Sequence, residues 1–330
     1  MVQIMGKEVG PTGFGLMGFT WRAQPCPQEQ AFEAMREALQ QGAVFWNGGE
    51  FYGTPEYNSM VLLERYFEKY PEDADQVILS IKGGLNLQTH QPDGSPEGTR
   101  RSIDNCLRQL NGRKKLDMFE FARRDQKADM KETFTIIQKE YIDTGKIGGI
   151  SLSEVRAETI HEAVKHAKIV ACEVELSLFS TDVLHNGVAE ACAQYGIPLV
   201  AYSPLGRGFL TGEIKTFDDI PKDSFLRGMP RFQPGGNFEN NIKLVHEVEE
   251  LAKKKSCTPA QLAISWVRAL NGRPGLPTII PIPGATRAER VRENSKVVEL
   301  TSEEMNAIDQ ILNGFKPVGA RYPDSVPMET

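Results

Sequence analysis

Short apolar runs alternate along the chain with longer segments in which apolar residues recur at helical spacing. Eight of the runs predict strands, at residues 13–18, 44–47, 77–82, 116–122, 147–152, 169–175, 198–202 and 278–282. The segment QEQAFEAMREALQQG, after the first run, places Phe32, Met35 and Leu39 on one face. Pro27 precedes its first turn and Gly42 follows its last, as is typical of a helix.

Eight successive strand-then-helix units predict a barrel. The 330 residues show no break in composition, so we expect one domain over residues 1–330 with the α/β architecture of a (β/α)8 TIM barrel. A helix near residue 301 is predicted from Thr301 and Glu304, which have capping-box spacing. A doubly wound parallel sheet is the competing architecture.

The stretch GFGLMG, residues 13–18, is the main support for that competitor. It matches the G-x-G-x-x-G pattern of dinucleotide-binding folds, which requires a helix to begin within the pattern. The chain continues FTWRAQPCPQ, and Pro25 and Pro27 postpone the next helix to about residue 28. We therefore interpret GFGLMG as a first barrel strand whose glycines let the backbone approach a ligand closely.

Two long segments are predicted to be irregular. Residues 205–238 are rich in glycine and proline, and a long loop in a compact domain is often a lid or a binding loop. A helix is expected to begin near Glu239. The tail after Phe315 is expected to be irregular and to lie over the surface.

Composition and charge exclude several functional classes. The net charge of -6 argues against nucleic acid and anionic membrane as partners, since affinity for phosphates comes mostly from clustered Lys and Arg. No apolar run reaches the roughly 18 residues of a membrane helix, and MVQIMGKEVG lacks the pattern of a secretory signal. Five scattered cysteines are typical of reduced thiols. We expect a cytoplasmic protein.

Candidate catalytic residues stand at the ends of predicted strands. Asn47, Lys82 and Ala122 end the second, third and fourth strands, and Tyr52 lies on the loop after the second. In a barrel these positions meet at one mouth. A tyrosine has a pKa near 10, which a neighbouring ammonium lowers, so Tyr52 is a candidate general acid for a carbonyl oxygen. Packing or solvation is the stronger explanation of each residue taken alone, and only their joint placement favours a site.

Four segments carry a resemblance to a known family. FYGTPEYN, ILSIKGG, VAYSPLGRG and IPGATRAERVREN resemble, in order and spacing, motifs of the aldo-keto reductase superfamily, over nearly the whole chain. WNGGEFYGTPEYN and LDMFEFARRD look most like the fungal pyridoxal reductases. The resemblance implies reduction of an aldehyde, pyridoxal to pyridoxine, by hydride transfer from NADPH.

The family's catalytic residues are Asp, Tyr, Lys and His, and two of the four differ here. Tyr52 and Lys82 match, whereas Asn47 stands in place of Asp and Ala122 in place of His. Asn47 can accept a hydrogen bond from Lys82 but supplies no charge. We therefore expect Lys82 either to lose its proton more easily or, as an uncompensated ammonium, to depress the pKa of Tyr52 further. The space at Ala122 is expected to admit a bulkier substrate ring.

The resemblance also implies a cofactor site. By matching positions it consists of Thr20, Trp21, Ser151, Glu173, Tyr202, Ser203, Leu205, Arg207, Gly284, Thr286, Arg287, Arg290, Glu293 and Asn294. Tyr202 would stack on the nicotinamide. Arg287 and Arg290, at the start of a helix, suit a 2′-phosphate and favour NADPH over NADH. Alternatively, Arg290 and Glu293 form only a surface ion pair.

The expected contacts with the nicotinamide carboxamide are incomplete. Ser151 matches the family, but Leu152 stands in place of Asn and Glu173 in place of Gln. Glu173 can accept a hydrogen bond from the amide, whereas Leu152 cannot form one. Glu50 and Arg123 lie close in sequence to the departures and are possible substitutes for the missing polar groups.

Two other functions remain open. Asn47 and Ala122 are also compatible with a regulatory or sensor protein of the same fold that binds NADPH and turns over slowly or not at all. A metal-dependent hydrolase has little support, because the five histidines show no paired ligand spacing at strand ends, and no metal site is expected. The sequence selects neither an exact aldehyde nor an oligomeric state.

Overall fold

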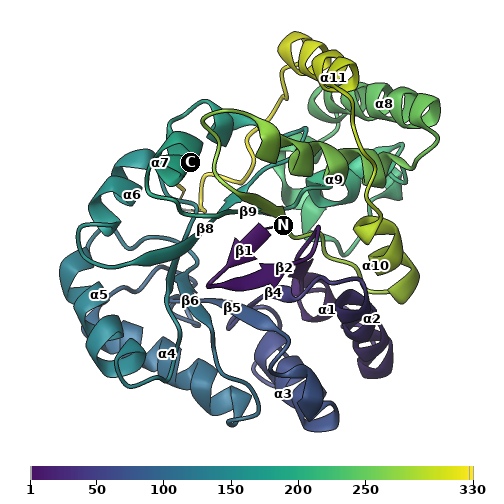
Figure 1. Ribbon diagram of the computed structural model, residues 1–330. Helices are drawn as coiled ribbons and strands as arrows, with labels where there is room; N and C mark the ends of the chain where they lie inside the picture. Colours follow the sequence, from purple (N-terminus) through teal and green to yellow (C-terminus); the bar gives the residue numbers. More distant parts are fainter. Residues whose placement is uncertain (1, 327, 330) are drawn as a thin grey trace.

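The computed structural model describes residues 2–326, 328 and 329, and its centre is one sheet of eight parallel strands (Figure 1). The strands are β3 (Phe14–Gly15), β4 (Phe45–Gly49), β5 (Ile78–Gly83), β6 (Met118–Phe121), β7 (Ile150–Ser153), β8 (Ile169–Glu175), β9 (Leu199–Tyr202) and β10 (Ile279–Pro281). The principal helices are α1 (Met17–Thr20), α2 (Gln28–Gln40), α3 (Ser59–Lys69), α4 (Pro96–Leu110), α5 (Met130–Ile137), α6 (Ala157–Ala163), α7 (Val188–Gln194), α8 (Asn237–Lys255), α9 (Pro259–Ala269), α10 (Ala288–Ser295) and α11 (Ser302–Gly314).

The order of the strands in space is their order in the chain, from β3 to β10. The first and last strands also meet, because Gly15 forms a parallel bridge with Gly284 and the Gly13 amide donates to the Pro281 carbonyl at 2.9 Å. A doubly wound sheet reverses its strand order at a switch point, and this sheet has none. The predicted (β/α)8 barrel is therefore confirmed, with helices around the outside of the strands (Figure 1).

The GFGLMG stretch corrects two expectations. A Cβ on Gly13 would lie 2.8 Å from the Phe45 carbonyl oxygen, and one on Gly15 would lie 3.0 Å from that of Ile282. These glycines thus allow close packing of β3 against its neighbours, whereas a ligand approach was expected. A helix also begins before residue 28, since Trp21 donates to the Met17 carbonyl and closes the single turn of α1. The prolines stop that turn from extending but do not prevent it.

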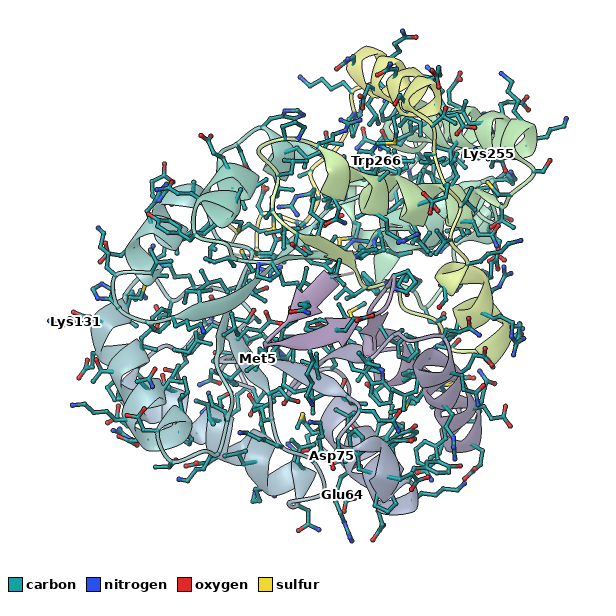
Figure 2. All side chains as sticks on the ribbon, in the orientation of Figure 1. Met5, Glu64, Asp75, Lys131, Lys255 and Trp266 are labelled. Atoms are coloured by element: carbon teal, nitrogen blue, oxygen red, sulfur yellow. The ribbon has the colours of Figure 1, made fainter. Side chains whose placement is uncertain are left out.

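A hairpin that the sequence reading missed lies at the centre of the ring of strands (Figure 1). Strands β1 (Val2–Ile4) and β2 (Lys7–Val9) are antiparallel, joined by Met5 and Gly6, both with positive φ. Ile4 and Val9 are buried in a cluster with the inward-facing residues Phe45, Ile78, Met118, Ala171, Val200, Ile280 and Ile282. In Figure 2 Met5, at the hairpin turn, lies near the middle of the view, whereas Lys131 lies at its edge. The hairpin covers one end of the barrel core.

Several predicted elements are confirmed with small shifts. Helix α2 begins at Gln28 with Pro27 before it, and α11 has the Thr301–Glu304 capping box. The long loop after the seventh barrel strand contains short 3-10 helices (Gly206–Thr211, Phe217–Asp219, Phe225–Gly228 and Pro230–Phe232), and α8 begins two residues before Glu239. In the part of the chain that the structure describes, no helix is both long enough and apolar enough to cross a membrane.

Candidate active site

Tyr52 lies just beyond the end of β4, at the barrel mouth. Its ring packs across Gly49, where a Cβ would come within 2.8 Å of the ring, so only glycine leaves the ring this room. The Thr20 hydroxyl donates to the Tyr52 carbonyl at 2.6 Å, and the Trp21 ring lies 5.1 Å from the Tyr52 ring. Thr20 and Trp21, expected to bind the cofactor, therefore also position Tyr52, which is 8% exposed.

Lys82, at the end of β5, is buried among polar groups from three other strands. Its ammonium donates to Asn47 Oδ1 at 3.2 Å and forms a close ion pair with Glu173. Glu120 Oε1, on the neighbouring strand β6, lies 3.4 Å from the same ammonium. Two carboxylates, which we call the carboxylate pair (Glu120 and Glu173), thus face one buried ammonium.

Asn47 joins this cluster as a hydrogen-bond donor as well as an acceptor. Its side-chain amide donates to Glu120 Oε1 at 2.9 Å and to Glu173 Oε2 at 2.6 Å. The Ser151 hydroxyl is 3.2 Å from Glu120 Oε2 and 3.0 Å from the Ala171 carbonyl. The expectation of an uncompensated Lys82 is wrong, because the carboxylate pair supplies the negative charge that Asn47 lacks.

The sequence reading missed Glu120, although a signal was present. In LDMFEF it is the one charged residue inside β6, and it is fully buried. Parallel register sets Glu120 beside Lys82 on one side and beside Ser151 on the other. A carboxylate inside a buried strand requires a cation or a set of donors, so its position pointed to Lys82.

The electrostatics at Tyr52 differ from expectation. Burial raises the pKa of Tyr52 to about 12, since the lowering by Lys82 is opposed by the charges of Glu173 and Glu120. Burial lowers the pKa of Lys82, but Glu173, Tyr52 and Glu120 together outweigh it and raise the pKa above its usual value. Burial, the largest cause, and Glu120 raise the pKa of Glu173, while the Lys82 ammonium acts in the opposite direction. The depressed Tyr52 pKa predicted from an unpaired Lys82 is therefore wrong.

The two substitutes considered for missing polar groups differ in placement. The Glu50 carboxylate accepts from Ser102 at 2.5 Å and from Asn105 at 2.7 Å, so it holds α4 in place and is not a replacement at the site. Ala122 is buried directly after β6. The Arg123 guanidinium lies 5.3 Å from the ring of Tyr322, on the tail side of the mouth, with its Nε buried and unpaired within the described residues.

The platform expected for the nicotinamide is Tyr202, at the end of β9. Its ring lies 5.7 Å from the Lys82 ammonium, so it belongs to the same mouth as the cluster around that ammonium. Its hydroxyl is 2.9 Å from the hydroxyl of Tyr322, which comes from the C-terminal tail. The tail has no helix or strand in its described part, as predicted, but it reaches the site and is not confined to the surface.

Buried ion pairs hold this tail. Arg321 is bonded to Glu154 at 2.9 Å and to Glu175 at 3.3 Å, at the ends of β7 and β8. Arg207, predicted to bind cofactor, is 3.2 Å from Glu175 and lies over the Tyr322 ring at 4.6 Å. Neither Arg321 nor Tyr322 was selected from sequence, since an irregular tail gives no periodic signal.

The loop that leads from Tyr202 is tight. The Ser203 carbonyl accepts from the Gly206 amide at 2.9 Å, and the Leu205 carbonyl accepts from the Gly208 amide at 3.0 Å. Ser203 and Arg207 both have positive φ. This loop therefore presents a compact run of backbone groups next to the platform.

The remaining predicted cofactor residues gather around α10. Gly284 pairs with Gly15, the Thr286 carbonyl accepts from Gln30, and Arg287 caps α10 without a side-chain hydrogen bond to it. Arg290 forms the foreseen pair with Glu293 at 2.7 Å and a second, close pair with Glu213 of the long loop. Asn294 is buried. The side chain of Arg287 is 68% exposed and that of Arg290 is 50% exposed.

The predicted grip on the carboxamide does not fit as expected. Both Glu173 oxygens contact Lys82 or Asn47, and the Ser151 hydroxyl contacts Glu120 and Ala171. Leu152 is apolar and buried. The ring platform at Tyr202 and the phosphate site at the start of α10 stay predictions. Among the described residues, no group of three or more His, Cys, Asp or Glu side chains is arranged to hold a metal.

Comparison with known proteins shows the family to which the chain belongs. The profile of the aldo/keto reductase family matches residues 11–313. A Schizosaccharomyces pombe protein with the name "Probable pyridoxal reductase 2" is 43% identical, over 97% of this chain and 96% of its own length. A Saccharomyces cerevisiae protein with the name "Putative pyridoxal reductase" is 41% identical, over 94% of this chain and 95% of its own length. A glycerol dehydrogenase structure from Gluconobacter oxydans, 22% identical, shares the fold with a TM-score of 0.82 over 99% and 98% of the two chains. The chain therefore belongs to the aldo/keto reductase family of oxidoreductases.

Proposed function

We propose that this protein reduces an aldehyde with NADPH, and that pyridoxal is the first substrate to test. The observation that carries the proposal is the buried group at the barrel mouth, where Tyr52 lies within the field of the Lys82 ammonium and that ammonium lies 5.7 Å from the Tyr202 ring. The names of the two fungal relatives, at 43% and 41% identity, support pyridoxal.

Tyr52 is the proton donor in this proposal. Reduction of a carbonyl places negative charge on its oxygen, and a phenol within hydrogen-bond distance stabilises that charge by donating its proton. Lys82 stabilises the phenolate that remains. Bound NADPH would supply the hydride. Asn47 and the carboxylate pair all contact this ammonium.

The cofactor would be held at two places. Tyr202 presents an aromatic face to the nicotinamide, and Ser203, Leu205 and Arg207 would lie along the pyrophosphate. At the other end, the uncapped amides of α10 with Arg287 and Arg290 suit a 2′-phosphate. Arg290 would exchange its pairs with Glu213 and Glu293 for the phosphate. Thr286, Glu293 and Asn294 would lie near the adenine.

Steady-state oxidation of NADPH with pyridoxal tests the proposal, with wild type compared with Tyr52→Phe. Loss of the donor is expected to lower kcat by about 10²- to 10⁴-fold, the range typical of general acid catalysis, with little change in the KM for NADPH. Tyr195→Phe, an exposed tyrosine on the outside of the barrel, serves as the control and should behave as wild type. Equal rates for wild type and Tyr52→Phe would remove Tyr52 from the mechanism.

A sensor that binds NADPH without turnover is the second candidate. Two observations favour it: Ser151 and Glu173 are engaged with other protein groups, and no imidazole stands at Ala122 to help hold a carbonyl oxygen. The same assay separates the two functions. Tight binding of NADPH, measured by quenching of tryptophan fluorescence, without oxidation by a panel of aldehydes would identify the sensor.

A further inference from the structure

The strongest feature that the proposed function leaves unexplained is a surplus of acid groups around Lys82. One ammonium faces Glu120, Glu173 and the neutral amide of Asn47, all of which are at most 5% exposed. Burial of a second carboxylate is costly unless it is paired, so its presence calls for an explanation. Asn47 offsets part of the free-energy cost of burying them, because its amide donates to both carboxylates.

The negative charge that a carboxylate at position 47 would supply to Lys82 comes instead from β6 and β8. From there, both members of the carboxylate pair contact Lys82 and act on Tyr52 through space. The ionisable groups that bear on Tyr52 are Lys82 from β5, Glu120 from β6, Glu173 from β8 and Tyr322 from the tail. Its ring neighbours Trp21 and Phe51 are uncharged. Only Lys82 favours the phenolate.

We propose that Glu120 and Glu173 are positioning residues that hold the Lys82 ammonium in place of an acid at position 47 and keep Tyr52 in its proton-donating form. The proposal rests on the assignment of Tyr52 as proton donor. The consequence is a reductase in which the Tyr52 hydroxyl keeps its proton far into the alkaline range. Removal of one carboxylate leaves more of the Lys82 charge to favour the phenolate, so Tyr52 would lose its proton at lower pH.

The experiment follows the titration of Tyr52 in the cofactor-free protein. Protein labelled with ¹³Cζ-tyrosine is titrated by NMR, and the Tyr52 signal is assigned as the one missing from Tyr52→Phe. In wild type this signal should titrate only above the ordinary tyrosine pKa of about 10. In Glu173→Gln it should titrate about 1 to 3 pH units lower than in wild type, the shift expected from one charge at close range. This readout needs no turnover, so it stands even if the proposed activity fails.

A rescue variant and a matched control separate charge from structure. Adding Asn47→Asp to Glu173→Gln returns a carboxylate to the Lys82 ammonium, and the titration should move back toward wild type. Glu50→Gln removes an equally buried carboxylate that is bonded to α4, and it should leave the Tyr52 titration unchanged. Glu120→Gln tests the second member and replaces Glu173→Gln if that variant does not fold.

Kinetics give the second readout. The kcat/KM for aldehyde reduction should stay level to about pH 10 in wild type and decline from a lower pH in Glu173→Gln, by the same displacement as the NMR titration. Unchanged titration in Glu173→Gln and Glu120→Gln would overturn the proposal, as would a displacement that Asn47→Asp does not reverse or that Glu50→Gln reproduces. Loss of activity in Tyr52→Phe bears only on the proposed function.

Discussion

At the scale of single residues, the room for the Tyr52 ring depends on one missing methyl group. Gly49 lies at the end of β4, and a Cβ there would lie 2.8 to 2.9 Å from three atoms of the ring. Such a distance is well below van der Waals contact, so the ring must move. Because a displacement of about 1 Å in a reacting group can cost on the order of 100-fold in rate, this position controls activity more than stability.

Gly49→Ala is expected to lower kcat by at least about tenfold, while the cost of overpacking to the free energy of unfolding is about 1–3 kcal/mol. Steady-state kinetics and urea denaturation measure the two effects. Gly314→Ala, which adds the same methyl at the end of α11 in open space, is the control and should leave kcat unchanged. An unchanged kcat in Gly49→Ala would show that the ring tolerates the displacement.

The residues with recognisable chemistry at strand ends could be predicted from sequence, and their partners could not. Tyr52, Lys82 and Asn47 do come together, because parallel strands end at one rim. Glu120 was missed because it lies within a strand, and its meaning depends on which strand is its neighbour. The predicted direction of the Tyr52 pKa shift was wrong because burial, the largest cause, together with the charges of Glu173 and Glu120 outweighs the Lys82 ammonium.

At the scale of elements, helix α10 combines a helix start with two arginines. Arg287 precedes the helix and Arg290 lies in its first turn, and both have exposed side chains. A phosphate there would receive hydrogen bonds from guanidinium groups, each worth about 1.5–3 kcal/mol. Only a cofactor with a 2′-phosphate gains them.

The double substitution Arg287→Ala with Arg290→Ala is therefore expected to raise the KM for NADPH by about 10- to 100-fold and to change that for NADH by less than about threefold. Initial rates with each cofactor measure the difference. Arg292→Ala removes a guanidinium from the same helix, one that is bonded to Glu37 at 2.6 Å, and should spare the preference. Equal losses for both cofactors would count against a 2′-phosphate at α10.

Elements of ordinary length could be predicted from periodicity, and the shortest could not. The eight strands and helix α2 follow apolar patterns, and their ends shift by a few residues. The turn of α1 and the β1–β2 hairpin are too short for a periodic signal. They form because Trp21 closes on Met17 and because Ile4 and Val9 enter the barrel core. Met5 and Gly6 between two short runs were the signal for the hairpin.

At the scale of the whole molecule, one domain over residues 1–330 stays a prediction, and unfolding tests it. Trp46 in β4 and Trp266 in α9 are both buried, so each reports on its own part of the barrel. In variants that keep one of these two as the only tryptophan, the urea midpoint from fluorescence should coincide with the midpoint from circular dichroism. If the two midpoints differ within a variant, the barrel unfolds in separate parts.

The seam between Gly15 and Gly284 bears on how the chain reaches its native state. Nearly the whole polypeptide separates these partners, so the ring of strands stays open during synthesis until the last strand has left the ribosome. Until then β3 and β9, the strand that β10 will pair with, each have one edge whose backbone groups lack a partner strand. Contacts between such distant positions slow folding, and an open sheet can associate with other chains. We therefore expect closure of the seam to be the late event in biogenesis, the point after which aggregation ceases to compete.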